Sequence, residues 1–396
     1  MKLRSMLLAG AISVLSSLPA SAADYVMSVS ADFSGPFANV MPDAMSGVKS
    51  VIKWWNKEVG AGIGVTVVPK IYDMRYDAAV VAKTWPAILS SDKPIMHLGF
   101  GSPDLVTLMK RLPNDKVPML LGTAMVGLVW AENGWHYSIR PTYSHEFAGL
   151  FSKLQADSGN KLKIAAISTQ NQAGFVDQVN GVKKLAETYP DRFEVVDVQW
   201  ADTAPVSLTA QMRAISAKSP DVVLVGGTTA QVIAASKAMS ELGTSIPIVT
   251  STHNGLYEVS KGIDLAQMEG SYSAFSFAPP AKATKIHEIF EANKEDGKWG
   301  LITAQSAAQA ILALRVLEKA VEAKGKDGVD GVAMHDALLA NVFTEESLLG
   351  ALPTLDYDTS APFPIGEIKA TAETVRDGKI VTVSDEWMAV PELKKW

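Results

Sequence analysis

The chain has no cysteine among its 396 residues. This absence excludes a cysteine nucleophile, a zinc site built on thiolates and an iron–sulfur cluster. It also excludes disulfides, which a chain of this length can do without because it buries a large hydrophobic core. Hydrophobic residues make up 47% of the sequence, so packing alone can stabilise the fold.

The sequence also lacks an excess of positive charge and a long apolar run. Its 36 basic residues face 42 acidic ones, and loss of Lys2 and Arg4 with the N-terminal segment would leave a net charge of −8. The apolar stretches near 302–321 and 222–236 are interrupted by polar residues, whereas a membrane span takes roughly 20 apolar residues. We therefore expect no nucleic-acid partner and no stable membrane insertion.

Catalytic motifs are missing as well. There is no Gly-x-Ser-x-Gly elbow, no phosphate loop ending in Gly-Lys-Ser/Thr and no His-Glu-x-x-His helix. The six histidines are scattered, and His145-Glu146 and His287-Glu288 are isolated pairs. These observations predict no metal, no cofactor and no enzymatic activity, with a secreted hydrolase kept as a less favoured alternative.

The first residues of the chain have the order of charge, apolar core and small residues that is typical of a secretory signal peptide. Lys2 and Arg4 precede an apolar run over 6–15, and Ala20-Ser21-Ala22 supplies the small residues that a signal peptidase reads. A buried N-terminal helix is the alternative. We expect residues 1–23 to be a signal peptide, cleaved after Ala22 or Ala23, and the protein to be exported.

Behind this segment, short β-rich runs alternate with amphipathic helices in two similar sets. The first set has expected strands at 25–30, 65–72, 95–100 and 117–121, and expected helices at 42–58, 77–90 and from Ser102. The second set follows Arg140-Pro141, with expected helices at 146–157, 174–189, 205–217 and 230–242, and expected strands at 163–168, 193–200, 222–225 and 247–250. Such alternation predicts an α/β fold of two doubly wound, parallel-sheet lobes.

A helical block and two further strands complete the sequence. Helices are expected at 282–295, 302–323 and 330–340, and strands at 365–369 and 380–383. The periodicity does not decide whether this block forms a third unit or returns to the first lobe.

Several local segments, in a shared order, resemble one protein family. They are Ser34-Gly35-Pro36, Gly99-Phe100-Gly101-Ser102, the stretch from Gly134 to Pro141, the strand and turn from Pro220 to Gly227, and the stretch from Leu349 to Asp356. Together they resemble the branched-chain amino-acid-binding group of periplasmic solute-binding proteins, which serve ABC importers.

The resemblance implies a fold in which the chain crosses three times between two lobes. Lobe 1 would contain 24–140 and 272–350, and lobe 2 would contain 141–271 and 351–396. It implies a periplasmic protein, expected to be a monomer, that closes on a small solute by hinge bending and delivers it to a membrane permease. A sensor that presents its solute to a receptor is the alternative.

Ligands of open α/β sheets bind outside the carboxyl ends of the strands. On the first lobe this rule favours Ser102, whose hydroxyl begins a helix, and the loop Gly122-Thr123-Ala124. The resemblance implies backbone and hydroxyl contacts in that loop. Phe33, Phe37 and Phe100 are expected to line the first-lobe wall, with Tyr143 near the first crossing between the lobes.

On the second lobe the expected contacts are Gln172, Ala173, Thr228 and His253. The resemblance places a tyrosine at the position of Ala173 and often at that of Thr228, and an acidic residue near His253 for the ammonium of an amino acid. This chain has no acid at 252–254, so an aromatic or other organic acid is expected beside an amino acid as the candidate solute.

Overall fold

Five parallel strands form the first sheet of the computed structural model, which describes residues 22–122, 133–393 and 396. Their order is β2-β1-β3-β4-β5. The bounds are β1 (Ala23–Ala31), β2 (Val65–Asp73), β3 (Met96–Gly99), β4 (Met119–Leu121) and β5 (His136–Ser138). The sheet is largely buried, because helices and loops cover it on both faces.

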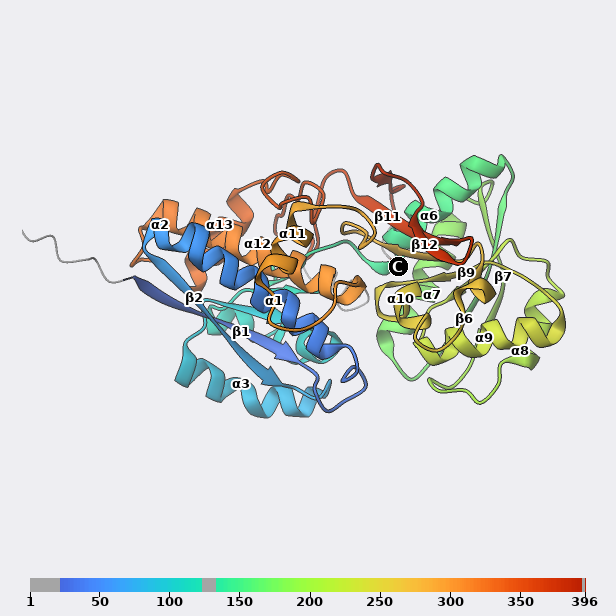
Figure 1. Cartoon of the computed structure of the whole chain (residues 1–396), viewed down its shortest axis with the longest axis horizontal. Helices are drawn as coiled ribbons and strands as arrows, with labels where there is room; N and C mark the ends of the chain where they lie inside the picture. The colour runs from blue at the N-terminus through green and yellow to red at the C-terminus, as the bar shows by residue number, and fades with distance from the viewer. Residues whose placement is uncertain (1–21, 123–132, 394–395) are drawn as a thin grey trace, which may run out of the picture.

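Helices from both ends of the sequence cover this sheet (Figure 1). The early ones are α1 (Met41–Trp55), a π-helical turn η1 (Asn56–Gly60), α2 (Ala61–Ile63), α3 (Ala78–Asp92), α4 (Ser102–Leu108) and α5 (Leu112–Asp115). The late ones are α11 (Lys285–Asn293), α12 (Leu301–Lys324) and α13 (Gly331–Ala340). Because α12 packs on α1 inside the first core, the helical block returns to the first lobe.

Eight strands form the second sheet, with the order β12-β11-β10-β9-β8-β6-β7 and β13 paired to β11. The bounds are β6 (Leu162–Ser168), β7 (Phe193–Trp200), β8 (Val222–Val225), β9 (Ile248–Thr250), β10 (Tyr272–Phe275), β11 (Lys369–Arg376), β12 (Lys379–Thr382) and β13 (Met388–Ala389). The strands from β10 to β7 are parallel, whereas β11 runs antiparallel to β10 and to β12.

The helices of the second lobe follow its strands in alternation. They are α6 (Tyr143–Ser158), α7 (Ala173–Thr188), α8 (Thr209–Ser216), α9 (Thr229–Leu242), η2 (Thr252–Asn254), α10 (Leu256–Val259) and η3 (Leu265–Met268). Two clusters of buried residues, one on each face of the sheet, form the core of this lobe. The fold class predicted from the sequence is confirmed.

Some expected boundaries differ from the observed ones. The strand β10 pairs with β9, so the second sheet extends past the division expected at 271/272. Leu352, Leu355 and Tyr357 belong to the first core, so the chain leaves the first lobe later than expected at 350/351. The expected strand 365–369 is wrong for most of its length, because the strand begins at Lys369 and Gly366 has a φ of +81°.

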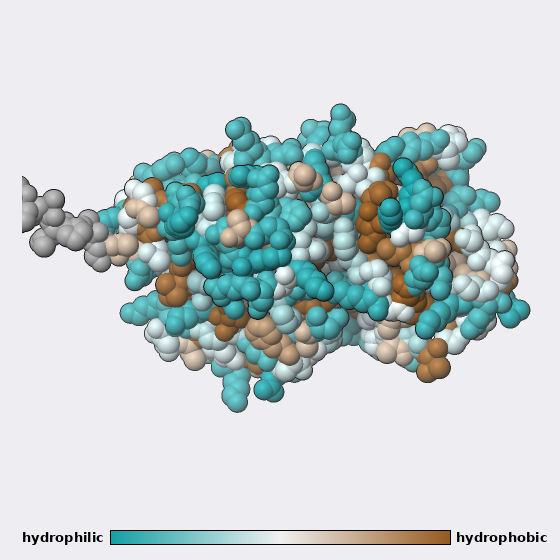
Figure 2. All heavy atoms as spheres, in the orientation of Figure 1, coloured by the Kyte–Doolittle hydropathy of each residue, from teal (hydrophilic) through white to brown (hydrophobic). Residues whose placement is uncertain are grey.

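The surface in view is mostly hydrophilic, with scattered apolar groups (Figure 2). The two lobes meet at a narrower waist in both views. Within the described part of the chain, no helix combines the length and the apolar character that crossing a membrane requires. The expected signal peptide at 1–23 falls almost wholly outside the described residues.

Candidate functional site

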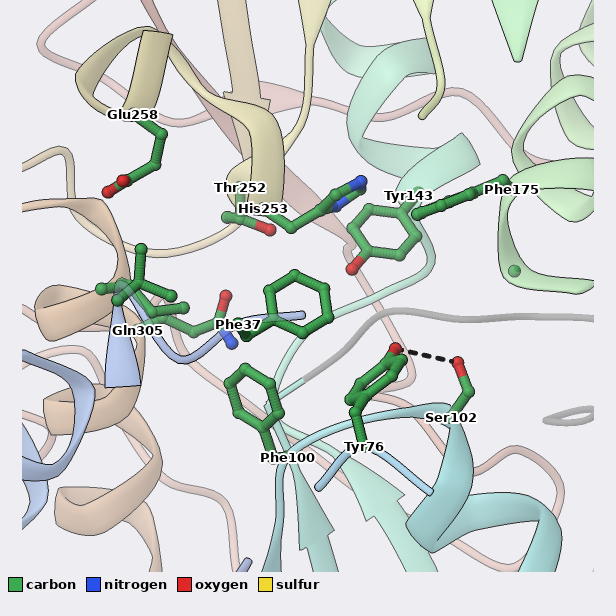
Figure 3. Close-up of a pocket in the computed structure, with 13 residues that line it drawn as sticks. Phe37, Tyr76, Phe100, Ser102, Tyr143, Phe175, Thr252, His253, Glu258 and Gln305 are labelled. Atoms are coloured by element: carbon green, nitrogen blue, oxygen red, sulfur yellow. Dashed lines mark hydrogen bonds between the residues drawn. The ribbon is translucent and has the colours of Figure 1, made fainter. Parts of the chain in front are cut away.

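A hollow between the two lobes gathers side chains from loops at the carboxyl ends of strands in both sheets (Figure 3). It encloses about 620 Å³ of space, including its open mouth. Both lobes contribute, so a molecule held here touches both. The lining residues are Phe37, Val40, Tyr76, Phe100, Ser102, Ile302 and Gln305 from the first lobe, and Tyr143, Gly174, Phe175, Thr252, His253 and Glu258 from the second.

Three aromatic rings form the wall on the first lobe. Phe37 follows β1, Tyr76 follows β2 and Phe100 follows β3. The Phe37 ring meets Tyr76 edge-on at a centroid distance of 4.8 Å and Phe100 at 5.5 Å. Edge-to-face pairs of this kind contribute about 0.5–1.5 kcal/mol each beyond their buried area. The three rings therefore form a firm apolar surface for a flat or apolar solute.

A buried carboxylate holds the loop that carries Phe100 and Ser102. Asp104 accepts hydrogen bonds from the backbone N–H of Phe100 at 2.9 Å and of Gly101 at 3.1 Å, and from the Ser30 hydroxyl at 2.6 Å. Although burial opposes it, the imidazole of His97, 3.8 Å away, and the hydrogen bond from Ser30 hold the pKa of Asp104 below its usual value. The carboxylate is ionised, and it uses two backbone N–H groups at the start of α4.

The opposite wall belongs to the second lobe. The Phe175 ring stacks on His253 with 5.1 Å between centroids and 17° between planes. The edge of Tyr143 meets the same imidazole at 5.5 Å. Figure 3 shows the Tyr143 hydroxyl pointing into the hollow toward the first-lobe rings. On the first lobe, the Tyr76 and Ser102 hydroxyl oxygens lie 3.3 Å apart.

His253 presents a ring face to this wall, because both of its nitrogens are engaged. Nε2 lies 2.7 Å from the carbonyl oxygen of Gly227, which can only accept, so Nε2 carries the proton. Nδ1 then accepts from the Ser251 hydroxyl at 2.8 Å. Burial lowers the pKa of His253 to about 4, so the ring is neutral at pH 7. The expected hydrogen bond from His253 to a solute therefore has no free nitrogen to make it.

Two polar side chains of the hollow differ in charge. Gln305 reaches it from the second turn of α12 and is 6% exposed. Glu258 reaches it from α10, and its carboxylate oxygen lies 2.8 Å from the ammonium of Lys261. The hollow thus has one acid, although the sequence places none at 252–254.

The structure brings four of the predicted residues to the hollow: Phe37, Phe100, Ser102 and His253. Gly122 lies beside it, since a Cβ there would come within 2.8 Å of Nε2 of Gln305. Gln172 is an exposed residue next to α7, and Ala173 begins that helix. Thr123 and Ala124 lie outside the described residues.

Two other expectations are not met. Thr228 caps α9 by accepting from the backbone N–H of Gln231, and its hydroxyl donates to the carbonyl of Thr203, so its oxygen is used within its own loop. Phe33 is 46% exposed and does not line the hollow. Tyr143, expected near the first crossing between the lobes, begins α6 just after it and lines the hollow from the second lobe.

Sequence reasoning missed Tyr76, Phe175, Glu258 and Gln305. Phe175 supplies an aromatic ring two positions after Ala173, where the resemblance places a tyrosine. Gln305 and Gln309 are two amides four apart in the buried first half of α12, and this pattern is a signal that could have been used. Within the described ranges, no three histidine, aspartate or glutamate side chains are grouped so as to hold a metal ion.

Two α/β lobes with an aromatic hollow between them define a protein that holds a small molecule by contact from both sides. The chain belongs to the periplasmic binding protein family, whose model matches residues 26–385. This membership places the protein outside the cytoplasm. No curated protein sequence matches the chain.

Solved structures of the same fold cover nearly all of the chain. A branched-chain amino acid ABC transporter protein of Thermus thermophilus with bound valine has a TM-score of 0.77 at 15% identity, covering 94% of this chain and 97% of its own. A leucine-binding protein of Thermotoga maritima has 0.71 at 14%, covering 92% and 98%. A solute-binding protein of R. palustris in complex with benzoate has 0.71 at 16%, covering 94% and 98%.

Proposed function

We propose that this protein captures a small solute with an aromatic or apolar body and a carboxylate, and delivers it to the permease of an ABC importer. The observation that carries the proposal is the aromatic hollow, in which rings of both lobes face one another. A flat apolar body between these rings buries its surface at about 25 cal/mol per Å². Proteins of the same fold bind benzoate and valine, two carboxylates with apolar bodies.

An amino acid is the second candidate, and Glu258 is the observation that favours it. A carboxylate at the edge of the hollow can pair with an ammonium group. Lys261 already neutralises much of this charge at 2.8 Å, so an ammonium would have to compete with it. We therefore rank an aromatic acid ahead of an amino acid.

Thermal melting with a panel of benzoate, L-phenylalanine and L-leucine tests the proposal. A bound solute stabilises the native state in proportion to the logarithm of its concentration over its Kd. We expect benzoate to raise the Tm most. Stabilisation by L-leucine without any by benzoate would favour the amino acid, and no shift with any of the three would overturn both candidates.

Delivery to an importer, rather than to a receptor, is supported by the fold, which the chain shares with binding proteins of ABC transporters. Uptake of labelled benzoate by cells with and without the gene separates the two uses. An importer component is required for uptake, whereas loss of a sensor changes the response to benzoate and leaves uptake intact.

We infer that binding occurs without catalysis. Ser30, His97 and Asp104 are the residue types of a hydrolytic triad, but Asp104 accepts from Ser30 at 2.6 Å instead of holding the far nitrogen of His97. All three are buried outside the lining of the hollow. In a triad the carboxylate orients the imidazole and the serine is open to substrate, so this group fits a structural role.

The remaining expectations stand as part of the proposal. The signal peptide would be removed after Ala22 or Ala23, leaving a periplasmic monomer that neither binds nucleic acid nor inserts stably into the membrane. The exact mass of the exported protein determines the cleavage site, and sedimentation equilibrium determines the oligomeric state.

A further inference from the structure

Gln305 is a polar side chain that lines the hollow, and its amide can donate hydrogen bonds. It stands on α12, which is buried along most of its length, and Figure 3 shows its amide beside Phe37 at the edge of the aromatic rings. Gly122 leaves room for this amide, because a Cβ at that position would lie 2.8 Å from Nε2. Burying an amide without a hydrogen-bond partner costs free energy, and a bound molecule can supply that partner.

Arg140 fixes the direction of the amide. Its Nη1 lies 3.3 Å from Oε1 of Gln305. A guanidinium has only donors, so the atom that faces it has to be the amide oxygen. The NH2 group of Gln305 is therefore turned away from Arg140, and no hydrogen-bond acceptor contacts it among the described residues. Of the two residues only Gln305 lines the hollow, and its N–H donors are the part of the amide that Arg140 leaves available to a molecule there.

Positive charge lies behind Gln305, on the guanidinium of Arg140. Arg140 is fully buried, with its guanidinium 4.8 Å from the centre of the Tyr143 ring. Glu146 lies 3.4 Å from Nε, but neither Nε nor Nη2 of Arg140 has a hydrogen-bond partner in the described chain. Burial raises the pKa of Glu146 to about 7 despite Arg140, so this carboxyl only partly neutralises the guanidinium at pH 7.

Negative charge lies behind Ser102, which lines the hollow from the same lobe as Gln305, at the start of α4. The Asp104 carboxylate occupies the backbone N–H groups of Phe100 and Gly101, and Pro103 has no N–H to offer. A second carboxylate placed at Ser102 would approach Asp104. Arg140 behind Gln305 and Asp104 behind Ser102 therefore carry opposite charges, while the acid of the lining itself is Glu258, which is paired with Lys261.

We propose that Gln305, oriented by Arg140, binds the carboxylate of the solute, and that Ser102 does not. In this arrangement the apolar body lies among Phe37, Tyr76 and Phe100, and its acid end meets the N–H donors of α12. Gln305 touches the solute, and Arg140 is a positioning residue that acts through it. The inference rests on the proposed function and specifies the orientation of its solute.

Calorimetric titration with benzoate tests this orientation, with L-leucine as the probe if only L-leucine binds the wild type. Gln305→Glu replaces the donor by a carboxylate, and Gln305→Met removes the donor at similar length. We expect both to weaken binding at least tenfold. Gln211→Glu on α8 makes the same change of charge away from the hollow and should leave the Kd unchanged. If Gln305→Glu does not fold, Gln305→Met alone decides.

Ser102→Ala provides the comparison at the start of α4, with an expected change of no more than about threefold, because the proposal gives Ser102 no contact with the carboxylate. A larger loss for Ser102→Ala than for Gln305→Met would overturn the orientation. Unchanged binding by both Gln305 variants would also overturn it while leaving the proposed function intact. A wild type that binds neither probe would overturn the proposed function itself.

Arg140 needs a measurement that a purely structural role would not change. The ratio of the Kd for benzamide to the Kd for benzoate reports recognition of charge. We expect Arg140→Met to lower this ratio at least fivefold, and Arg140→Lys, which keeps a donor and a charge, to restore part of it. Equal losses for benzoate and benzamide in Arg140→Met would show a structural role and overturn this part of the inference.

Discussion

Single buried carboxyl groups give this protein a stability that depends on pH. Glu373 on β11 is fully buried, and its Oε1 accepts from the Tyr257 hydroxyl at 3.4 Å and from the N–H of Ala281 at 3.3 Å, while Oε2 has no partner among the described residues. Burial raises the pKa of Glu373 to about 8. The native state therefore favours the protonated form of this side chain.

The first prediction concerns Glu373→Gln. Because the folded pKa is raised above the unfolded one, the folded protein holds a proton that the unfolded chain has released between about pH 4.5 and 8. The free energy of unfolding of the wild type should fall as the pH rises through this window, by about 1.4 kcal/mol per pH unit, and that of the variant should fall less. Urea unfolding at pH 5 and pH 8 measures the difference, with the exposed Glu386→Gln as the control. Equal losses in the wild type and Glu373→Gln would contradict the assignment.

At the scale of residues, the sequence predicted positions better than roles. The rule that binding loops follow strands placed Phe37, Phe100, Ser102 and His253 at the hollow. It could not show that His253 has both nitrogens engaged, since its partners Ser251 and Gly227 come together only in the fold. Gln305 was missed because α12 follows no strand of the first sheet and reaches the hollow from the returning segment.

At the scale of elements, one close contact joins the early and late parts of the first lobe. α1 and α12 approach each other at Gly47, where a Cβ would lie 2.7 Å from the carbonyl oxygen of Thr303. Thr303 lies in the first turn of α12 next to Ile302, and Gln305 follows in the second turn; both Ile302 and Gln305 line the hollow. The glycine thus sets how closely α12 lies on the first lobe.

The second prediction is that Gly47→Ala destabilises the protein by roughly 1–3 kcal/mol, the usual range for overpacking. The backbone carbonyl of Thr303 cannot move aside as a flexible side chain would. Gly62→Ala on α2 is the matched control, since no atom lies within 4 Å of a Cβ there. Urea unfolding of both variants measures the effect, and equal midpoints for the two would contradict it.

Periodicity predicted strands with a clear apolar pattern well, even where they are short. β7 alternates apolar and polar residues over much of its length and β8 is wholly apolar, and both have the predicted bounds. β5 and β10 were missed, because their short runs His-Tyr-Ser and Tyr-Ser-Ala-Phe mix polar and apolar residues and depend on neighbouring strands. β11 contains Thr, Glu and Arg, and only its place between β10 and β12 makes it a central strand.

The crossing segment between β5 and α6 leads to the third prediction. Glu146 lies 3.4 Å from Arg140, and burial raises the pKa of Glu146 to about 7. Ionisation above this pH cancels more of the positive charge behind Gln305, so the affinity for benzoate should fall by roughly threefold from pH 6 to pH 8. His253 does not titrate in this range, because burial lowers its pKa to about 4. Glu146→Gln should remove the fall in calorimetric titrations, and a fall that persists in this variant would contradict the explanation.

At the scale of the whole molecule, the two lobes share one hollow and are joined by three chain crossings. Each lobe has its own buried core, so the lobes can move as units while the crossings bend. A solute that contacts both Phe100 on the first lobe and Phe175 on the second stabilises the closed arrangement, because it can touch both rings only when the two lobes are close together.

The fourth prediction is that saturating benzoate lowers the radius of gyration in small-angle X-ray scattering. The expected cause is a shift of population toward the closed arrangement, in which both walls contact the solute. The same measurement with benzamide, which lacks the charge, should show a smaller change at equal concentration. Superimposable scattering curves with and without benzoate would contradict closure.

The return of the chain to lobes already begun has a consequence for the order of folding. The first core requires α12, and the second sheet requires β11, a strand that lies between β10 and β12. The first core therefore stays incomplete until the residues up to Tyr357 are available, and the second sheet until β11 is available, and contacts this distant in sequence form slowly. Because the hollow needs side chains from both lobes, the binding site forms only after the last strands of the sequence have joined the second sheet.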